Sequence, residues 1–453
     1  SILLEFGANL DLIVSGGAPI NEKYIEFFDS SSVENVVSCL AQPPEKVYLL
    51  GADLIALENA CRLYEEVFAD RGVNVDFFPS VIEKPDQLSS IVEALTNVLE
   101  KEPDCCIDLT GGSDLCLVAI GVVAERYKDR GLQMHRFNLY DHSVVDCDGD
   151  GNVISDMPAP RLSVEEYIRV YGGRLLREDE APGGTYRWDL NADGFSKDIE
   201  TMWKISRGQH PYQLQQNQKF RKNTGKTKAF RDWNRHIGIL SALERFDPSE
   251  KLTTRLPYDF VCTHLRDDNG KDISYSPNKL IGETLEREGL CSITRDGDDL
   301  VVTYKNEQVK RCLTKAGQVL EMIVYLYAAR AKDDYNSAVN GAYLDWDGRL
   351  NANGSNADTR NEIDVLMMHY LQPVFVSCKN GDVKRDELFM LHTVASRFGG
   401  SFAKKALIAS CLNEMENAKF LRERAAELEI AVVEPVEMSD DAFEKKIREL
   451  WRA

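Results

Sequence analysis

Two pairs of polar side chains in the last third of the sequence have the types and the spacing for metal-assisted chemistry. Glu362 and Asp364 stand two residues apart in one largely apolar segment, and Ser377 and Lys379 stand two apart in the next. Because side chains alternate between the faces of a strand, each pair projects from one face if the segments are strands. A divalent cation held by carboxylates, with a lysine beside it, can neutralise a phosphate and activate water for phosphodiester cleavage.

The pairing of the two segments decides whether these groups share a pocket. A turn centred between Leu371 and Gln372 would place Asp364 directly opposite Lys379, with their Cβ atoms about 5 Å apart. A cross-strand salt bridge, worth well under about 1 kcal/mol, is the alternative to a catalytic pair. The spacing alone favours this salt bridge.

A glycine-rich turn near residue 110 has the composition of a phosphate cradle. An apolar segment at 105–109 runs into Thr110, Gly111, Gly112, Ser113 and Asp114, and an apolar helix follows to Tyr127. Glycines let the backbone bend, and a helix N-terminus presents N–H groups to an anion. A tight turn with an ordinary helix cap at Ser113 or Asp114 explains the same residues.

Two further loops could share a ligand crevice with this turn. The loop after the first expected strand contains Asp29, Ser30, Ser31 and Ser32, with Asn35 in the first turn of the helix that it opens. In a doubly wound sheet, ligands bind where two such loops meet at the carboxyl ends of the strands. The wall of the crevice would come from the loop Gly51, Ala52 and Asp53.

An alternation of strands and helices is expected to position the glycine-rich turn. Strands are predicted at 24–28, 46–50, 73–78 and 105–109, and helices at 33–40, 54–70, 87–101 and from Asp114 onward. This βαβα order predicts a parallel sheet covered by helices. Residues 1–22 lie outside the pattern, and no element is assigned to them.

The rest of the chain divides into a connector and a second α/β block. A hairpin and connector are expected over 141–194, then a helix at 276–289 and a hairpin of 291–294 with 300–304, which together resemble a winged helix. The last block is expected to contain a helix at 309–331 and another at 383–398. Its strands are predicted at 342–346, 362–369, 374–379, 407–410 and 431–434.

Composition limits the function classes. The 453 residues carry a formal charge of −20, which argues against a globally basic nucleic-acid binder. One local basic cluster, with Asp232 as its only acid and with Phe220, Phe230 and Trp233 interleaved, could follow a phosphate backbone or could be a solvated helix face. Its basic members are Lys219, Arg221, Lys222, Lys226, Lys228, Arg231 and Arg235.

The cysteines and histidines indicate a reduced protein without a sequence-local zinc site. The 11 cysteines lack CxxC spacing, and the 7 histidines form neither HxH nor HExxH patterns. We therefore expect a cytoplasmic protein whose metal, if any, is held by oxygens, as Mn²⁺ or Mg²⁺ would be. No apolar run approaches the roughly 20 residues of a membrane helix, and the first 20 residues lack the features of a signal peptide.

Four sequence segments resemble the CARF sensor domain of CRISPR ancillary nucleases. The resemblance covers about 23–173, and its most specific part is DLTGGSD. It implies a homodimer in which two facing sensor crevices bind one cyclic oligoadenylate, expected to be the tetra-adenylate, and a two-fold dimer suits a two-fold ligand. The segments are IEFFDSSSVENVVSCL, EKVYLLGAD, IDLTGGSDLCLVAIG and LSVEEYIRVYGG.

The segments NEIDVL and PVFVSCKNG resemble the hallmark strands of the PD-(D/E)XK nuclease fold in the same family, and LEMIVYLYAA resembles its first helix. This match spans about 310–400. It implies that Asp364, Glu321 and the carbonyl of Cys378 bind a metal ion, and that Lys379 orients water or stabilises charge. RNA, DNA or both would be the substrate.

One position departs from that pattern, because the family commonly has an acid where this chain has Ser377. Glu387 is the candidate replacement, since it shares a helical stripe with Leu391, Val394 and Phe398 and should face the sheet. It could equally be a first-turn carboxylate favoured by the helix dipole.

The expected fold class is α/β with three parts: a Rossmann-like CARF sensor at 23–173, a helical, winged-helix-like connector at 174–308 and a PD-(D/E)XK nuclease domain at 309–453. The expected function is a nuclease activated by cyclic oligoadenylate. The missing acid at Ser377 keeps a second hypothesis open, a ligand-responsive nucleic-acid-binding regulator with a degenerate nuclease fold.

Overall fold

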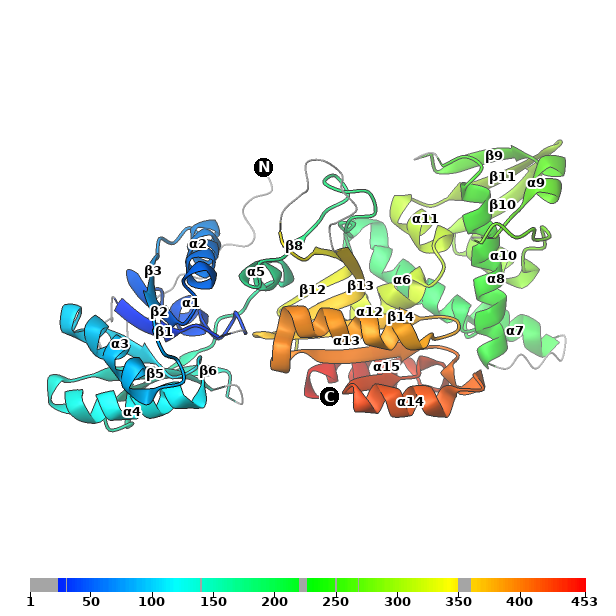
Figure 1. Ribbon diagram of the computed structural model, residues 1–453. Helices are drawn as coiled ribbons and strands as arrows, with labels where there is room; N and C mark the ends of the chain where they lie inside the picture. The colour runs from blue at the N-terminus through cyan, green and yellow to red at the C-terminus, as the bar shows by residue number, and fades with distance from the viewer. Residues whose placement is uncertain are drawn as a thin grey trace. The chain divides into compact units, whose positions relative to one another are not determined.

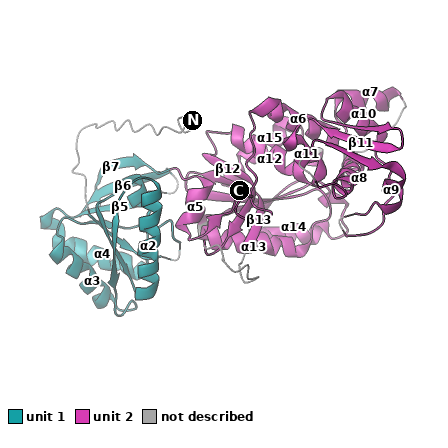
Figure 2. Cartoon of the chain, turned by 90° about the horizontal axis from the view of Figure 1, so that it is seen from above, with its two compact units in different colours: residues 1–160 teal, residues 161–453 magenta. Residues whose placement is uncertain are grey.

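The computed structural model divides the chain into two compact units, Ser1–Pro160 and Arg161–Ala453 (Figures 1 and 2). It describes residues 23–29, 31–138, 141–219, 226–248, 251–267, 269–348 and 360–453. The unassigned segment 1–22 lies outside the described residues. Among the residues described, no helix combines the length and apolarity that a membrane crossing requires.

The first unit is built on a seven-stranded sheet of order β3-β2-β1-β4-β5-β6-β7. Its first five strands in this order are parallel, and β6 and β7 add an antiparallel hairpin. This confirms the parallel sheet predicted from the βαβα alternation. The elements are β1 (Lys23–Phe27), α1 (Val37–Ala41), β2 (Lys46–Gly51), α2 (Leu54–Asp70), β3 (Asp76–Val81), α3 (Leu88–Lys101), β4 (Cys106–Asp108), α4 (Asp114–Tyr127), β5 (Gln133–Asn138), β6 (Ser143–Asp148) and β7 (Val153–Pro158).

The two faces of this sheet differ in chemistry. Ile25 and Phe27 of β1, Ile107 of β4 and Met134 of β5 pack with α3 and α4 in one hydrophobic core. Helices α1 and α2 lie on the other side of the sheet (Figure 1). The strand order reverses between β1 and β4, which is the switch point where doubly wound sheets bind ligands.

The second unit contains a six-stranded sheet of order β16-β15-β14-β13-β12-β8 and a three-stranded sheet of order β10-β11-β9. Its first elements are α5 (Val164–Val170), β8 (Arg174–Leu175), α6 (Phe195–Ser206), α7 (Pro211–Lys219), α8 (Lys226–Glu244), β9 (Thr253–Pro257), α9 (Tyr258–His264), α10 (Lys279–Arg287), β10 (Cys291–Asp296), β11 (Asp299–Tyr304) and α11 (Glu307–Thr314). The remainder are α12 (Gln318–Arg330), β12 (Ser337–Asp345), β13 (Arg360–His369), β14 (Gln372–Lys379), α13 (Arg385–Gly399), β15 (Lys404–Ala409), α14 (Ala418–Glu427), β16 (Ile430–Val433) and α15 (Asp440–Arg448).

One hydrophobic core runs through the second unit. Buried residues of α6, α8, α10 and α11 pack in the same cluster as those of α12, β13 and β14. The boundaries expected at residues 173 and 308 both fall inside this unit. Residue 173 is no boundary because α5, which precedes it, contacts β12 and β13. Residue 308 is no boundary because the elements on both sides of it share the core. The expected helix and hairpin of the connector are present as α10, β10 and β11, and β9 adds a strand that the sequence pattern did not predict.

The single helix predicted over 309–331 is wrong, because the chain forms two helices. Gly317 takes a positive φ of 86° and ends the link between α11 and α12. Glycine tolerates this conformation, which a residue with a side chain rarely adopts. The break places Lys315 in the link and Glu321 in the first turn of α12.

The predicted register of β13 and β14 is also wrong, because the centre of the turn lies one residue earlier than expected. His369 pairs with Gln372 and Val365 pairs with Val376, so the turn is centred between Tyr370 and Leu371. Tyr370 supplies the positive φ, 53°, at this two-residue turn. Continuing the register therefore places Asp364 opposite Ser377 rather than opposite Lys379.

Candidate functional site

Asp364 lies where the hydrogen-bonded ladder between β13 and β14 ends. The last pair of the ladder is Val365 with Val376, and beyond it the Asp364 carboxylate takes the place of a main-chain acceptor. Its Oδ2 accepts hydrogen bonds from the Cys378 backbone N–H at 2.6 Å and from the Ser377 hydroxyl at 3.2 Å. Burial raises the pKa of Asp364, and the positive charge of Lys379 opposes the shift.

Lys379 lies between two carboxylates from different elements. Its Nζ is 3.9 Å from Asp364 Oδ2 and 3.8 Å from Glu387 Oε1. The Glu387 side chain is 24% exposed, and its Oε2 accepts the backbone N–H of Lys384 at the start of α13. Glu387 therefore has features of both interpretations, a first-turn helix acid and a member of the Lys379 site.

Glu321 supplies a buried carboxylate from the first turn of α12. Its Oε2 accepts a hydrogen bond from Gln318 Nε2 at 3.1 Å, and the same Gln318 nitrogen donates to Asn340 Oδ1 at 3.0 Å. Asn340 in turn donates to the main-chain oxygen of Asp364 at 3.0 Å. Burial raises the pKa of Glu321 to about 7; Lys315 opposes this shift and Asp364 adds to it.

Lys315 is a site residue that the sequence pattern did not reveal. Its Nζ lies 3.1 Å from Glu362 Oε1 and 3.8 Å from Glu321 Oε2. Glu362, which is 43% exposed, thus pairs with Lys315 and not with Lys379. The sequence analysis missed it because a continuous helix over 309–331 would not direct the Lys315 side chain toward β13.

The donor set of this region fits a hard divalent cation. Asp364 and Glu321 offer carboxylate oxygens, while burial raises the pKa of the Cys378 thiol and keeps it protonated, leaving its carbonyl as the available donor. Among the described residues, the carboxylates of Asp364, Glu321 and Glu387 do not form a group with all ligand atoms within 4.8 Å of one another. Glu387 reaches the others through Lys379.

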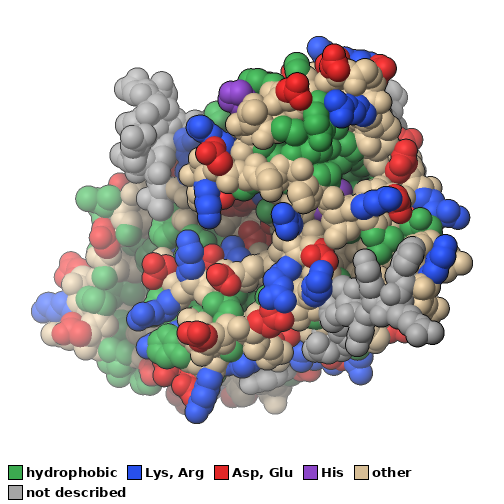
Figure 3. All heavy atoms as spheres, turned by 90° about the vertical axis from the view of Figure 1, so that its right-hand side faces the viewer, with side chains coloured by type: hydrophobic (Ala, Val, Ile, Leu, Met, Phe, Trp, Pro, Cys, Tyr) green, Lys and Arg blue, Asp and Glu red, His purple; other side chains and the backbone are tan. Residues whose placement is uncertain are grey.

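The basic cluster lies largely on α8, and its arrangement favours a solvated helix face. Lys228 pairs with Asp232 at 2.5 Å and Arg231 pairs with Glu414 at 3.1 Å. Phe230 and Trp233 are core residues, so they are not available to stack on bases. On the face shown in Figure 3, Lys and Arg side chains are interspersed with Asp and Glu. Lys219 ends α7, and 220–225 lie outside the described residues.

In the first unit, the two predicted ligand loops meet at the switch point. Asn35 is fully buried; its Oδ1 accepts the Asp29 N–H at 2.7 Å and its Nδ2 donates to the Asp29 carbonyl at 3.0 Å. A Cβ on Gly111 would lie 2.7 Å from the Phe27 carbonyl oxygen, so only glycine allows this approach. Ser31 donates its N–H to Asp29 Oδ1, whereas Ser30 lies outside the described residues.

Three further predicted sensor residues, Asp53, Ser113 and Asp114, lie at helix starts. Asp53 caps α2 by accepting from the backbone N–H groups of Ile55 and Ala56 at 2.9 and 3.2 Å. Ser113 is the N-cap residue of α4 and Asp114 is in its first turn, and both are exposed. Gly51 ends β2, where an added Cβ would lie 3.0 Å from Leu57 and 3.1 Å from Phe28, and Ala52 is exposed.

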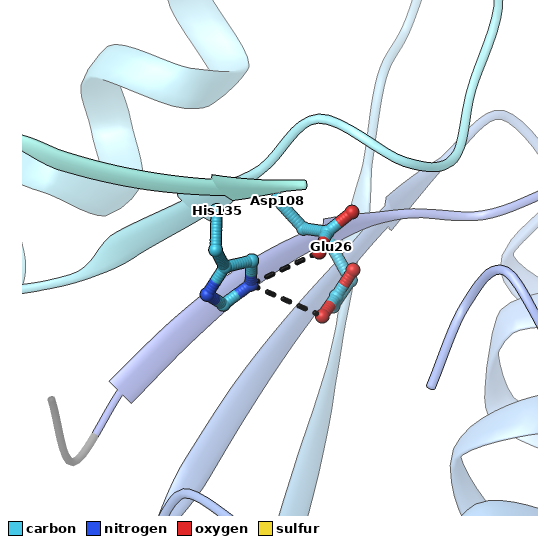
Figure 4. A group of neighbouring side chains, drawn as sticks. All are labelled: Glu26, Asp108 and His135. Carbon is cyan, nitrogen blue, oxygen red and sulfur yellow. Dashed lines mark ion pairs between the residues drawn. The ribbon is translucent and has the colours of Figure 1, made fainter. Parts of the chain in front are cut away.

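Directly below these loops lies a buried polar cluster that the sequence analysis missed. Glu26 of β1, Asp108 of β4 and His135 of β5 are 0%, 1% and 2% exposed, and their side chains converge (Figure 4). His135 Nε2 lies 3.0 Å from Asp108 Oδ2 and 3.9 Å from Glu26 Oε1. Burial, with the nearby charge of Asp108, raises the pKa of Glu26 to about 8.

Two solved structures align with nearly the whole chain. Protein VC1899 from Vibrio cholerae has a TM-score of 0.64 at 15% identity, and the match covers 95% of this chain and 98% of that one. Can2 from Sulfobacillus thermosulfidooxidans, solved in complex with cyclic tetra-adenylate, has a TM-score of 0.58 at 14% identity with the same coverage. The chain has the Can2 fold. This confirms, at the level of fold, the resemblance to CARF nucleases.

Comparison of whole sequences does not reveal this fold. No protein-family model matches the sequence, and no curated protein matches it either.

Proposed function

We propose that the chain is a metal-dependent nuclease of type III CRISPR antiviral defence, activated by cyclic oligoadenylate. The observation that carries the proposal is the meeting of Asp364, Lys379 and Glu321 from the two hallmark strands and the first helix. The Can2 fold over 95% of the chain supports the ligand class, because Can2 is bound to cyclic tetra-adenylate.

In the proposed nuclease site, Asp364, Glu321 and the Cys378 carbonyl would hold Mn²⁺ or Mg²⁺. Such an ion supplies charge neutralisation at the phosphate and lowers the pKa of bound water. Lys379 orients the attacking water or stabilises negative charge on the phosphate. Gln318 and Asn340 position the Glu321 carboxylate relative to the Asp364 main chain. Loss of Asp364 should therefore abolish cleavage.

In the proposed sensor, the oligoadenylate phosphates bind the loops 29–35 and 110–114 at the N-terminus of α4. A homodimer would bring two such crevices around one ligand. Exposed apolar side chains near the starts of α2 and α4 support a dimer surface here, because a second copy of the chain would remove them from water. They are Leu54, Ile55, Leu117 and Val118, which are 47%, 71%, 47% and 52% exposed.

A second function is favoured by one specific contact. Ser377 holds the position of the usual acid and donates its hydroxyl to Asp364, so one negative charge is missing from the metal site. A site that binds its cation too weakly to cut would leave a ligand-responsive nucleic-acid-binding regulator.

A cleavage assay separates the two functions. The full chain is incubated with Mn²⁺ and cyclic oligoadenylates of several ring sizes, on RNA, single-stranded DNA and double-stranded DNA. Cleavage that requires both the ring and the metal is expected. Binding of nucleic acid without cleavage under all these conditions would favour the regulator, and full activity in excess EDTA would overturn the metal mechanism.

A further inference from the structure

The Glu26, Asp108 and His135 cluster has the organisation of a built site, because three adjacent strands bring its members into one row. Asp108 pairs with His135 in the ladder of β4 and β5. The ladder of β1 and β4 pairs Ile25 with Ile107, and one more step places Glu26 beside Asp108. All three side chains point to the sheet face opposite the α3 and α4 core.

Neighbouring groups make hydrogen bonds or close contacts with each member of the cluster. Ser38 and the Thr110 N–H donate to Asp108, through Oδ2 and Oδ1 respectively, and Cys39 Sγ donates to Glu26 Oε1 at 3.4 Å. His135 Nδ1 contacts Cys106 Sγ at 3.3 Å, which directs Nε2 toward the carboxylates. These contacts resemble the outer hydrogen bonds that orient metal ligands.

One carboxylate oxygen in this cluster has no hydrogen-bond partner. Glu26 Oε2 is fully buried, and no donor in the described part of the chain reaches it. Burying an ionised carboxylate without a partner is costly, and the cost is met either by a proton, consistent with the raised pKa of Glu26, or by a bound cation. One divalent cation would balance two ionised carboxylates beside a neutral imidazole. Burial opposes protonation of His135, but Cys106 and Asp108 raise its pKa, so in the absence of an ion protons on His135 and Glu26 balance the cluster.

The spacing of the donor atoms fits a small coordination sphere. Metal–ligand bonds of about 2.0–2.2 Å in a tetrahedron place the ligands about 3.3–3.6 Å from one another. The distances from His135 Nε2 to Asp108 Oδ2 and to Glu26 Oε1, 3.0 and 3.9 Å, bracket this range (Figure 4). Cys39 Sγ, 3.4 Å from Glu26 Oε1, would become a fourth ligand only on losing its proton, because burial raises the pKa of this thiol.

We propose that Glu26, Asp108 and His135 bind a structural divalent transition-metal ion, Zn²⁺, beneath the ligand loops of the sensor. One imidazole nitrogen and two carboxylate oxygens are donors that zinc accepts. The ion would be linked to the glycine-rich loop through one residue, because Asp108 Oδ1 accepts the Thr110 N–H at 2.5 Å. Loss of the metal should also lower the affinity for oligoadenylate, and this expectation rests on the proposed function. The proposal that the cluster binds zinc does not rest on it.

The test measures zinc in the full chain with the nuclease site disabled. The Asp364→Asn, Glu321→Gln double variant is dialysed against a chelator and titrated with Zn²⁺ by calorimetry, and Co²⁺ is used as a visible-absorption probe of the ligand geometry. We expect one Zn²⁺ per chain. Adding Glu26→Gln, which keeps the side-chain shape, should weaken zinc binding by at least about 100-fold. Loss of a ligand should cost at least as much as loss of a group that only hydrogen-bonds to a ligand.

A matched control removes another buried histidine. His236 lies in the second unit and is 1% exposed, and His236→Gln in the same background should leave zinc affinity unchanged. Absence of stoichiometric zinc, or equal zinc affinity with and without Glu26, would overturn the proposal and indicate that protons fill the cluster. If the full chain binds zinc but binds no oligoadenylate, the result counts against the proposed function and not against the zinc site.

Discussion

The Ser377 hydroxyl donates a hydrogen bond to Oδ2 of Asp364 at 3.2 Å. This contact follows from the observed register of β13 and β14, which sets the two residues opposite each other. Ser377 therefore supports the Asp364 carboxylate with a neutral donor. Adding a charge here should reveal whether the pocket is built for a cation.

Ser377→Glu should make stability depend on metal. Without a cation, two carboxylates facing each other in a buried pocket repel, so Tm should fall relative to the unmodified chain. With Mn²⁺ the second carboxylate becomes a ligand, and Tm should recover by more than it does in the unmodified chain. Thermal denaturation with and without Mn²⁺ measures both effects. An equal response of the two chains to Mn²⁺ would argue against a cation at Asp364.

Glu387→Gln should lower the cleavage rate by at least about 100-fold, the scale of losing one positioned catalytic group. The reason is the 3.8 Å contact between Glu387 Oε1 and Lys379 Nζ, which holds the lysine beside Asp364. Asp386→Asn is the matched control, because Asp386 is the other acid in the first turn of α13. Similar rates for both variants would leave Glu387 as a helix-dipole residue only. Ser377→Glu should restore part of the activity of Glu387→Gln.

The pKa of Glu321, raised by burial to about 7, predicts a pH-dependent stability. The folded chain binds more protons than the unfolded chain between pH 4.5 and 7, so stability should fall as pH rises through this window. Glu321→Gln should remove that decline and be the more stable form at pH 8 without metal. Mn²⁺ affinity of the unmodified chain should rise over the same window, since the ligand is the ionised carboxylate. Denaturant titrations at pH 5 and 8 measure the stability change; parallel curves for the two chains would contradict it.

Ser113→Asp should separate stability from ligand binding in the sensor. Asp is a good N-cap residue, and Ser113 makes no capping hydrogen bond to α4, so stability should be unchanged or higher. The added negative charge should weaken binding of an anionic oligoadenylate by at least about tenfold. Ser439→Asp at the N-cap of α15 is the control for added charge. Unchanged oligoadenylate affinity in Ser113→Asp would move the ligand away from this loop.

Gly112→Val is a less discriminating variant than the sequence suggests. Gly112 has a φ of +91°, and a Cβ there would lie 2.8 Å from the Phe27 Cβ. The substitution should therefore lower Tm as well as ligand affinity. Because both quantities fall together, Ser113→Asp is the sharper probe of the same loop.

The order of strands and helices was predictable, because hydrophobic periodicity marks each element. The register of β13 and β14 was not, since the turn depends on a positive φ at Tyr370 and the sequence offers no glycine or asparagine there to signal it. The break before α12 was signalled by Gly317, yet the apolar run on both sides suggested one helix. Lys315 was missed with it.

The buried cluster of the sensor escaped the sequence analysis because its members are far apart in the chain. Each one nevertheless carried a local signal, a titratable residue at an inward position of an apolar strand, as Glu26 shows within β1. Only the sheet order, with β4 between β1 and β5, brings Glu26, Asp108 and His135 together. The expectation that any metal is held by oxygens alone did not take into account that His135 lies beside two carboxylates.

A comparison of the unmodified chain with Asp364→Asn tests the proposed activity most directly. Both proteins are assayed for binding of cyclic tetra-adenylate and, with Mn²⁺, for cleavage of RNA and of single- and double-stranded DNA. We predict equal ligand affinity for the two chains and cleavage by the unmodified chain alone, because Asp364 lies in the proposed nuclease site and not in the proposed sensor. Cleavage by Asp364→Asn at the unmodified rate would contradict the placement of the catalytic metal at Asp364.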